Sequence, residues 1–132
     1  MQALPLRLSP GDDLRDALGR LLAAQRVNAA YVVQGIGSLS AVELRYAGID
    51  DPTSLRGDYE ILTLAGSLAP DGVHLHMSVS DAQGRVFGGH VAHGCIVRTT
   101  AEVLVMLLPG FSFSREHDAQ TGYPELVVHK GK

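Results

Sequence analysis

Apolar and polar side chains alternate strictly over residues 73–80, and this is the clearest pattern along the chain. Every second position is apolar, through Val73, Leu75, Met77 and Val79, and the positions between them carry His74, His76, Ser78 and Ser80. A period of two predicts a half-buried β-strand. Residues 81–84 then predict a turn, since Asp81 opens it and Gly84 supplies the left-handed residue of a three-residue loop. We therefore expect a β-hairpin whose second strand leads to His90.

The length of the loop decides which side chains face each other across this hairpin. With residues 82–84 as the loop, His76 lies opposite His90. Directly opposed Cβ atoms are about 4.5–5.5 Å apart, and diagonal neighbours are about 7–8 Å apart. Because His74 shares the face of His76, the register predicts that three imidazoles converge. A slip of one residue would turn His90 to the opposite face, so this prediction depends on the turn.

His74, His76 and His90 form a candidate metal site. Three histidines with a free fourth position are the ligand set of an open zinc site, so we expect a divalent metal, zinc first. Gly88 and Gly89 precede His90, and glycine weakens a strand unless a ligand or another backbone must come close. The alternative is a solvated polar face on an ordinary antiparallel strand.

A helical period appears once, near the N-terminus. Ser9 is the expected N-cap, Pro10 takes the first helical position, and acidic residues fill the first turn. The apolar stripe consists of Leu14, Ala17, Leu18, Leu21 and Leu22. We expect one helix that ends near residues 26–28 and covers a sheet.

Further apolar runs predict the remaining strands. They cover residues 4–8, 29–33, 41–46, 59–68 and 125–129, while residues 95–108 form either one long strand or a strand and a bend. Residues 49–56 are predicted as a loop and residues 111–124 as a turn-rich segment. Many strands, hairpin connections and one helix predict a single α+β domain over residues 1–132, with a largely antiparallel, mixed β-sheet covered by one main helix.

Three polar or glycine positions have two interpretations each. Gly35 and Gly37 follow a strand, as in a phosphate-binding loop, but a third glycine and a following helix are missing, which favours close approach of backbones. Glu60 is either a fourth ligand or imidazole acceptor on the neighbouring strand, or an exposed charge. His93 has the opposite parity to His90, so we expect it to face elsewhere.

Composition limits the cellular setting. The 132 residues are 45% hydrophobic and 19% charged, as in a soluble globular domain. No run approaches the roughly 20 apolar residues of a membrane helix, and the N-terminus has no signal-peptide pattern. The single Cys95 lies in an apolar run, which predicts a buried structural thiol. Together these features predict a cytoplasmic protein without a membrane partner.

Charge argues against a nucleic-acid binder. The chain carries 11 basic and 14 acidic side chains, for a net charge of −3. Proteins that bind nucleic acids usually show a basic patch or stripe, and the arginines here are scattered.

Spaced motifs along nearly the whole chain resemble the PPC (plant and prokaryote conserved) domain, best known as the second half of plant AT-hook nuclear proteins. They are residues 35–40, 57–62, 74–76 with 88–90, 100–103, 113–115 and 121–126. The resemblance implies a homotrimer of α+β subunits and, as in some prokaryotic members, a metal held by His74, His76 and His90. It also implies a DNA-associated or regulatory role. The AT-hook, an Arg-Gly-Arg-Pro core that reads the minor groove, is missing from these residues.

Three functions compete at this point. The first is a trimeric regulatory or interaction module that has a protein partner and a structural or ligand-sensing metal. The second is a small metal-dependent lyase or hydrolase, since the fold also looks like that of acetolactate decarboxylase; Glu60, Glu102 and Arg115 are then the candidate acid, base or charge-stabilising groups. The third is a DNA-binding protein without an AT-hook, which would need Arg45, Arg56 and Arg98 on one face of the trimer.

Overall fold

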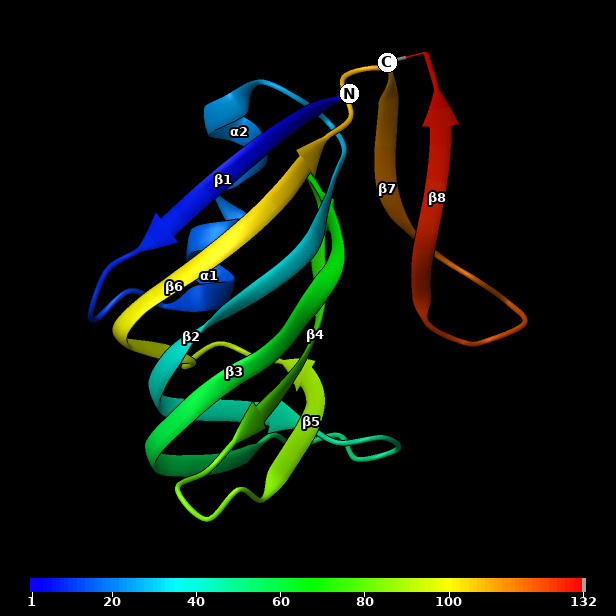
Figure 1. The fold of residues 1–132 in the computed structure, drawn as a ribbon. Helices are drawn as coiled ribbons and strands as arrows, with labels where there is room; N and C mark the ends of the chain where they lie inside the picture. Colours follow the sequence, from blue (N-terminus) through cyan, green and yellow to red (C-terminus); the bar gives the residue numbers. More distant parts are fainter. Residues whose placement is uncertain (132) are drawn as a thin grey trace.

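A six-stranded antiparallel sheet in the order β1-β6-β2-β3-β4-β5 forms the body of the protein, and a two-stranded hairpin, β7-β8, stands beside it (Figure 1). This computed structural model describes residues 1–131. The elements are β1 (Gln2–Leu8), α1 (Leu14–Gly19), α2 (Leu21–Gln25), β2 (Ala30–Arg45), β3 (Thr53–Ala69), β4 (Gly72–Ser80), β5 (Val86–Val91), β6 (Ile96–Leu107), β7 (Phe111–His117) and β8 (Pro124–Lys130). The predicted α+β class with an antiparallel sheet and one helical region is confirmed.

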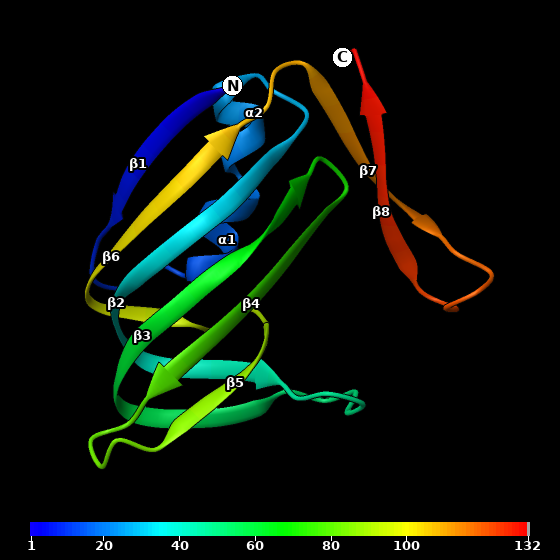
Figure 2. The same cartoon turned by 45° about the vertical axis from the view of Figure 1, so that its right-hand side comes forward.

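Strand β5 closes part of the sheet into a ring (Figure 2). It pairs with β4 on one side and with the end of β2 on the other, where Arg45 lies opposite His90. The ring brings β2 and β5 so close that a Cβ at Gly89 would lie 2.7 Å from the carbonyl oxygen of Arg45. The sequence predicted that this glycine makes room either for a ligand or for another backbone. The structure shows the close approach of another backbone.

The two helices cover one face of the sheet. Leu14, Leu18, Leu21 and Leu22 of this helical region are buried in one cluster with the inward residues of the strands, among them Leu75, Met77 and Val79 of β4. The histidines of β4 alternate with these buried residues and therefore face outward. Within residues 1–131, no helix is long and apolar enough to cross a membrane.

The predicted helix start at Ser9 is wrong. Residues 9–12 form a turn in which the Asp12 amide donates to the Ser9 carbonyl and Gly11 has a φ of +89°. Asp13 is the N-cap instead, and its carboxylate accepts the amide of Asp16 at 3.0 Å. The helix is also interrupted at Arg20, which separates α1 from α2. Asp and Ser are both good caps, and the left-handed Gly11 postpones the first turn.

Strand lengths differ from the prediction in two places. Residues 29–33 and 41–46 belong to one bulged strand, β2, which runs without interruption through the glycine segment. A Cβ at Gly37 would lie 2.3 Å from the Thr100 carbonyl oxygen, so the glycine lets β2 and β6 approach, as predicted, and no phosphate loop forms. Strand β3 begins at Thr53, so the second half of the predicted loop 49–56 is strand.

The C-terminal half of the sheet resolves one alternative and corrects one prediction. Residues 95–108 contain one long strand, β6, rather than a strand and a bend. The turn-rich assignment of residues 111–124 is wrong at its start, because residues 111–117 form β7 and pair with β8. Phe113 is 4% exposed and packs with Ala29 and Ala69 in a small second core. Charged residues directly after Phe113 obscure this short alternation in the sequence.

Candidate metal centre

Asp81 holds the turn of the β4-β5 hairpin. Its carboxylate oxygen Oδ1 accepts the amides of Gln83 at 2.9 Å and Arg85 at 2.8 Å, and Oδ2 accepts Nε of Arg85 at 2.7 Å. Gly84 takes the predicted left-handed conformation, with a φ of +78°. These bonds close the three-residue loop that the register requires. The local sequence therefore determines the alignment of the two strands.

The register brings the three predicted histidines together. His76 lies opposite His90, and Nε2 of His76 is 3.1 Å from Nδ1 of His90. The His74 ring stacks on the His90 ring with 5.5 Å between centroids. One ring nitrogen from each residue lies within 4.8 Å of the other two. We call His74, His76 and His90 the histidine triad.

Burial and neighbouring charges favour neutral imidazoles in the triad. Burial lowers the pKa of His74, and the positive charge of Arg115 and the other two imidazoles lower it further. The pKa of His90 is also lowered by burial, then by the charge of Arg45 and by His76. Neutral imidazole is the form that ligates a metal. The environment thus prepares two of the three side chains for ligation at neutral pH.

A cavity of about 830 Å³ adjoins the triad, with His74 and His90 in its wall. Helix α1, the end of β2, the β3-β4 turn and the β7-β8 hairpin supply other parts of the wall, so segments distant in sequence enclose it. Arg115 from β7 lies in this wall, as one of the predicted charged groups. The cavity leaves room beside the triad for a small molecule.

Two of the predicted acidic groups lie elsewhere. Glu60 pairs with Ser80, four residues from His76 along β4, or about 13 Å at the rise of a strand. Its interpretation as a fourth ligand is therefore wrong. Glu102, on β6, lies opposite Arg7 of β1, away from the β4-β5 hairpin. Glu125 of β8 also lines the cavity, and it lies close enough to His74 to raise the pKa of that imidazole. Glu125 lies in the family-like motif of residues 121–126, but its position beside His74 depends on the β7-β8 fold.

His93 belongs to a different contact, as its parity predicted. Its Nδ1 is bonded to the carboxylate of Asp16 in α1. Asp13, Asp16 and His93 also lie together, but the two oxygens of Asp13 already accept the amides of Asp16 and Gly94. This group joins the start of α1 to the loop before β6 and has a structural role.

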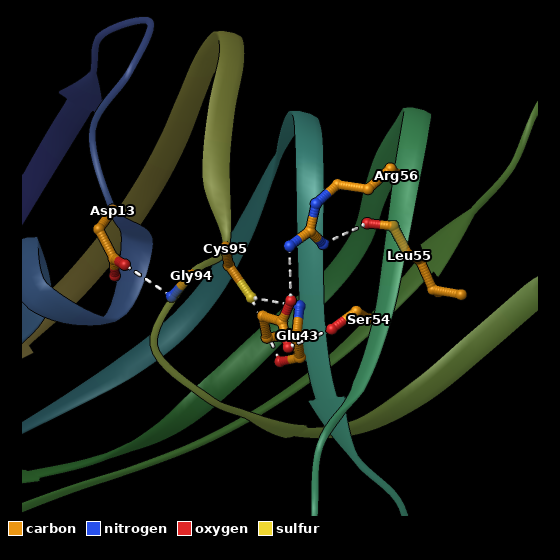
Figure 3. A network of polar contacts seen from close by, with 7 residues as sticks. All are labelled: Asp13, Glu43, Ser54, Leu55, Arg56, Gly94 and Cys95. Atoms are coloured by element: carbon orange, nitrogen blue, oxygen red, sulfur yellow. Dashed lines mark hydrogen bonds and ion pairs between the residues drawn. The ribbon is translucent and has the colours of Figure 1, made fainter.

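Cys95 anchors the same loop to β2 (Figure 3). Its thiol accepts the Glu43 amide at 3.3 Å and donates to the Glu43 carbonyl at 3.4 Å. The Glu43 carboxylate in turn accepts Arg56 at 2.9 Å and Ser54 at 2.8 Å. Cys95 is 0% exposed, which confirms the predicted buried thiol. The network fixes the segment that follows His90 and so supports the closed ring.

With this geometry, the comparison with known families is decisive. Residues 1–109 match the family model of the Plants and Prokaryotes Conserved (PCC) domain, also abbreviated PPC. The chain belongs to the PCC family. The matched region contains the triad and ends before β7, so the hairpin that encloses the cavity lies outside it.

Known relatives of this PCC chain span very different lengths. It is 46% identical over 130 residues to the bifunctional protein GlmU of Synechococcus sp. (strain JA-3-3Ab), a match that covers 98% of this chain and 21% of GlmU. The chain therefore spans about a fifth of that relative's length. A hypothetical protein from Salmonella enterica has the same fold, with a TM-score of 0.94, 41% identity, and coverage of 98% of this chain and 94% of that one.

A second solved PCC-like structure is described as a metal-containing protein, from Archaeoglobus fulgidus. It superposes with a TM-score of 0.82 at 26% identity, over 96% of this chain and 94% of that one. That description concerns the archaeal protein. In the present chain the histidine triad is the candidate for a metal, because one ring nitrogen from each of the three residues lies within 4.8 Å of the others. Ligands of a tetrahedral zinc ion lie about 3.3 Å apart at the usual Zn–N length.

Proposed function

We propose that this chain is a homotrimeric PCC-domain module that binds a divalent metal ion, zinc first, through the histidine triad. In this proposal the chain acts in regulation through a protein partner and does not bind DNA directly. The observation that carries the proposal is the opposition of His76 and His90, with His74 stacked beside them. When bound, such an ion supplies a Lewis acid, or a water whose pKa is lowered towards about 7.

The donor set supports a metal over a merely polar surface. The three ligand nitrogens come from two paired strands whose turn is fixed by Asp81, so the triad is assembled before any ion arrives. Pre-organised ligands of this kind lower the cost of ordering on binding. Three neutral nitrogen donors suit zinc and related transition metals better than magnesium or calcium, which prefer oxygen.

An uncovered apolar surface supports the homotrimer. The outer face of the sheet, opposite the helices, exposes Val33 (49%), Ile36 (50%), Leu62 (43%) and Leu104 (39%). A shallow groove on this face runs between β1, β2 and β6. Contiguous exposed apolar residues on a sheet are typical of protein interfaces. We propose other copies of the chain as the occupants.

Charge pairing supports an indirect relation to DNA. Two of the three arginines that a DNA-binding trimer would need are engaged within the subunit, since Arg56 pairs with Glu43 at 2.9 Å and Arg98 with Asp58 at 3.5 Å. The third, Arg45, lines the cavity. Phosphate binding needs free cations, so these contacts weaken the case for direct binding.

A metal-dependent lyase or hydrolase remains the second candidate, because the cavity adjoins the triad. Arg115 and Glu125 both line it. A charge-stabilising guanidinium and a carboxylate beside a Lewis acid are the groups that such chemistry requires.

The metal proposal is tested by elemental analysis of protein purified without a histidine tag. We expect about one zinc per subunit in the wild type, and loss of bound zinc in His76→Ala and His90→Ala. His93→Ala is the matched control, because His93 lies outside the triad. Circular dichroism verifies that each variant is folded. Equal metal content in all four proteins would contradict the proposal.

A further inference from the structure

Three arginines from separate elements line the cavity beside the triad. Arg15 comes from α1, Arg45 from the end of β2 and Arg115 from β7, and each is half-buried. Within residues 1–131, none of the three forms an ion pair with a carboxylate. The same cavity wall contains His74 and His90. Three guanidinium groups that have no carboxylate as an ion-pair partner therefore line one cavity.

The three arginines differ in how they are held. Arg15 donates from Nη1 to the carbonyl of Val91 at 3.0 Å, and Arg115 donates from Nη2 to the carbonyl of Pro124 at 3.1 Å. The side chain of Arg45 makes no hydrogen bond to any residue that the structure describes. A guanidinium carries five N–H donors, so most of these groups are free to bind a ligand. Arg45 is the most available of the three.

This arrangement brings like charges close together. Burial lowers the pKa of Arg15, the nearby carboxylates of Asp13 and Asp16 raise it, and the positive charge of Arg45 lowers it again, which places Arg45 near Arg15. Arg45 and Arg115 likewise act on the two triad histidines that line the cavity. Like charges that are partly withdrawn from water repel each other, and an anion placed between them removes that penalty.

The acidic residues that line the cavity, Asp50, Asp71 and Glu125, form no ion pair with these arginines within residues 1–131. Asp50 and Asp71 are exposed, and the carboxylate of Asp71 accepts the backbone amide of Arg115 at 3.0 Å. Glu125 also lines the cavity, and its charge acts on His74. Asp13 and Asp16, at the start of α1, act on Arg15, which leaves Arg45 and Arg115 as the guanidinium groups best able to bind an anion.

We propose that the cavity binds a small organic anion, a carboxylate or phosphate ester, whose acidic group pairs with Arg45 and Arg115 beside the histidine triad. Guanidinium groups bind planar carboxylates and phosphates through paired hydrogen bonds. The volume of about 830 Å³ is that of a small-metabolite site. Val73, Val91 and Tyr123 supply an apolar wall for the carbon skeleton. The effect of zinc on this site rests on the proposed function, whereas the arginine dependence does not.

Calorimetric titration of the purified chain tests the proposal, with succinate and glycerol 3-phosphate as probes for the two anion classes. Dimethyl succinate and glycerol are their uncharged counterparts. We expect saturable binding of at least one anion and none of the neutral compounds. Arg45→Gln and Arg115→Gln should each weaken binding about tenfold or more, the usual effect of removing a charge-assisted hydrogen bond. Arg98→Gln, outside the cavity, is the control.

Arg45→Gln is the decisive variant, since the Arg45 side chain makes no hydrogen bond within residues 1–131 and the substitution should leave the fold intact. Absence of saturable binding by either anion, or equal affinity in Arg45→Gln and Arg98→Gln, would overturn the proposal. Anion titrations of chelator-treated and zinc-loaded protein distinguish the proposed anion site from the proposed metal site. Arginine-dependent binding that zinc does not change would leave the anion site standing and show that the anion does not contact the metal, while loss of metal content remains the test of the triad. Zinc-enhanced binding that His76→Ala abolishes would support both.

Discussion

His76 and His90 lie directly opposite each other across β4 and β5, and Nε2 of the first is 3.1 Å from Nδ1 of the second. Two imidazoles held this close, without a carboxylate between them, repel each other once both are protonated. A shared metal ion replaces that repulsion by two ligand bonds. Protons and a metal ion therefore compete for the ring nitrogens of this pair.

Acid should release the metal. The pKa of His74 is lowered by burial first and then by Arg115, and the pKa of His90 by burial and then by Arg45, so both stay neutral at pH 7. The pKa values of His74 and His90 in the folded protein lie below the ordinary value of about 6.5. The stability that the neutral imidazoles contribute to the fold is therefore fully present above about pH 6.5 and is lost as the pH falls through the lowered pKa values. Zinc release, followed with a chromogenic chelator between neutral and acid pH, should occur in this window.

The Arg45→Gln variant tests whether the charge of Arg45 lowers the pKa of His90. Removing the positive charge raises the pKa of His90, so in metal-free protein the His90 titration, followed by NMR, should have a midpoint at higher pH than in the wild type. Arg98→Gln should leave the midpoint unchanged. A shift of the Arg45→Gln midpoint to lower pH would contradict the electrostatic account.

Asp81→Ala should weaken zinc binding without removing a ligand. The carboxylate holds the hairpin turn through the amides of residues 83 and 85, and its loss permits other registers. Zinc affinity, measured by competition with a chelator, should fall. Asp118→Ala is the matched control, since Asp118 accepts the Gln120 amide at 2.7 Å in the other hairpin. Unchanged affinity in Asp81→Ala would show that strand pairing alone sets the register.

Cys95 should be unreactive until the protein unfolds. Burial raises the pKa of its thiol from 9.0 to about 11, so the thiolate is scarce at pH 8. Labelling with a thiol reagent should follow the unfolding rate. The raised pKa also stabilises the fold fully below pH 9, and on the order of 2 kcal/mol is lost as pH rises towards 11. Rapid labelling of the native protein would contradict this prediction.

Ile36→Lys should convert the proposed trimer into monomers. Ile36 is 50% exposed at the centre of the outer sheet face, where a charge would be buried at an interface. Light scattering at micromolar concentration measures the change. Val86→Lys is the control, since Val86 is 59% exposed but lies at the start of β5. A monomeric wild type would refute the trimer itself.

The purified chain should not bind duplex DNA sequence-specifically at physiological salt. It has 14 acidic against 11 basic side chains, and a trimer triples that deficit. Any association should be weak and disappear as salt rises. An electrophoretic shift specific for one sequence at nanomolar protein would promote direct DNA binding to the leading function.

The sequence by itself determined the histidine hairpin, because every step there is local. Alternation assigns the face, Asp81 and Gly84 define the turn, and the turn length places His90 opposite His76. The buried leucine stripe and the buried Cys95 followed from local pattern in the same way. The same local reasoning chose the wrong cap, since Ser9 and Asp13 are both good N-caps and the left-handed turn at Gly11 decided between them.

Only the tertiary structure decided what surrounds the triad. The ring closure that pairs Arg45 with His90 joins β2 to β5 across more than 40 residues, and the cavity also needs Arg15 from α1 and Glu125 from β8. Glu60 was the plausible acidic neighbour from sequence, but the strand register carried it to Ser80. Periodicity specifies which face a side chain takes, whereas the meeting of distant segments depends on how a twisted sheet closes and buries its apolar face.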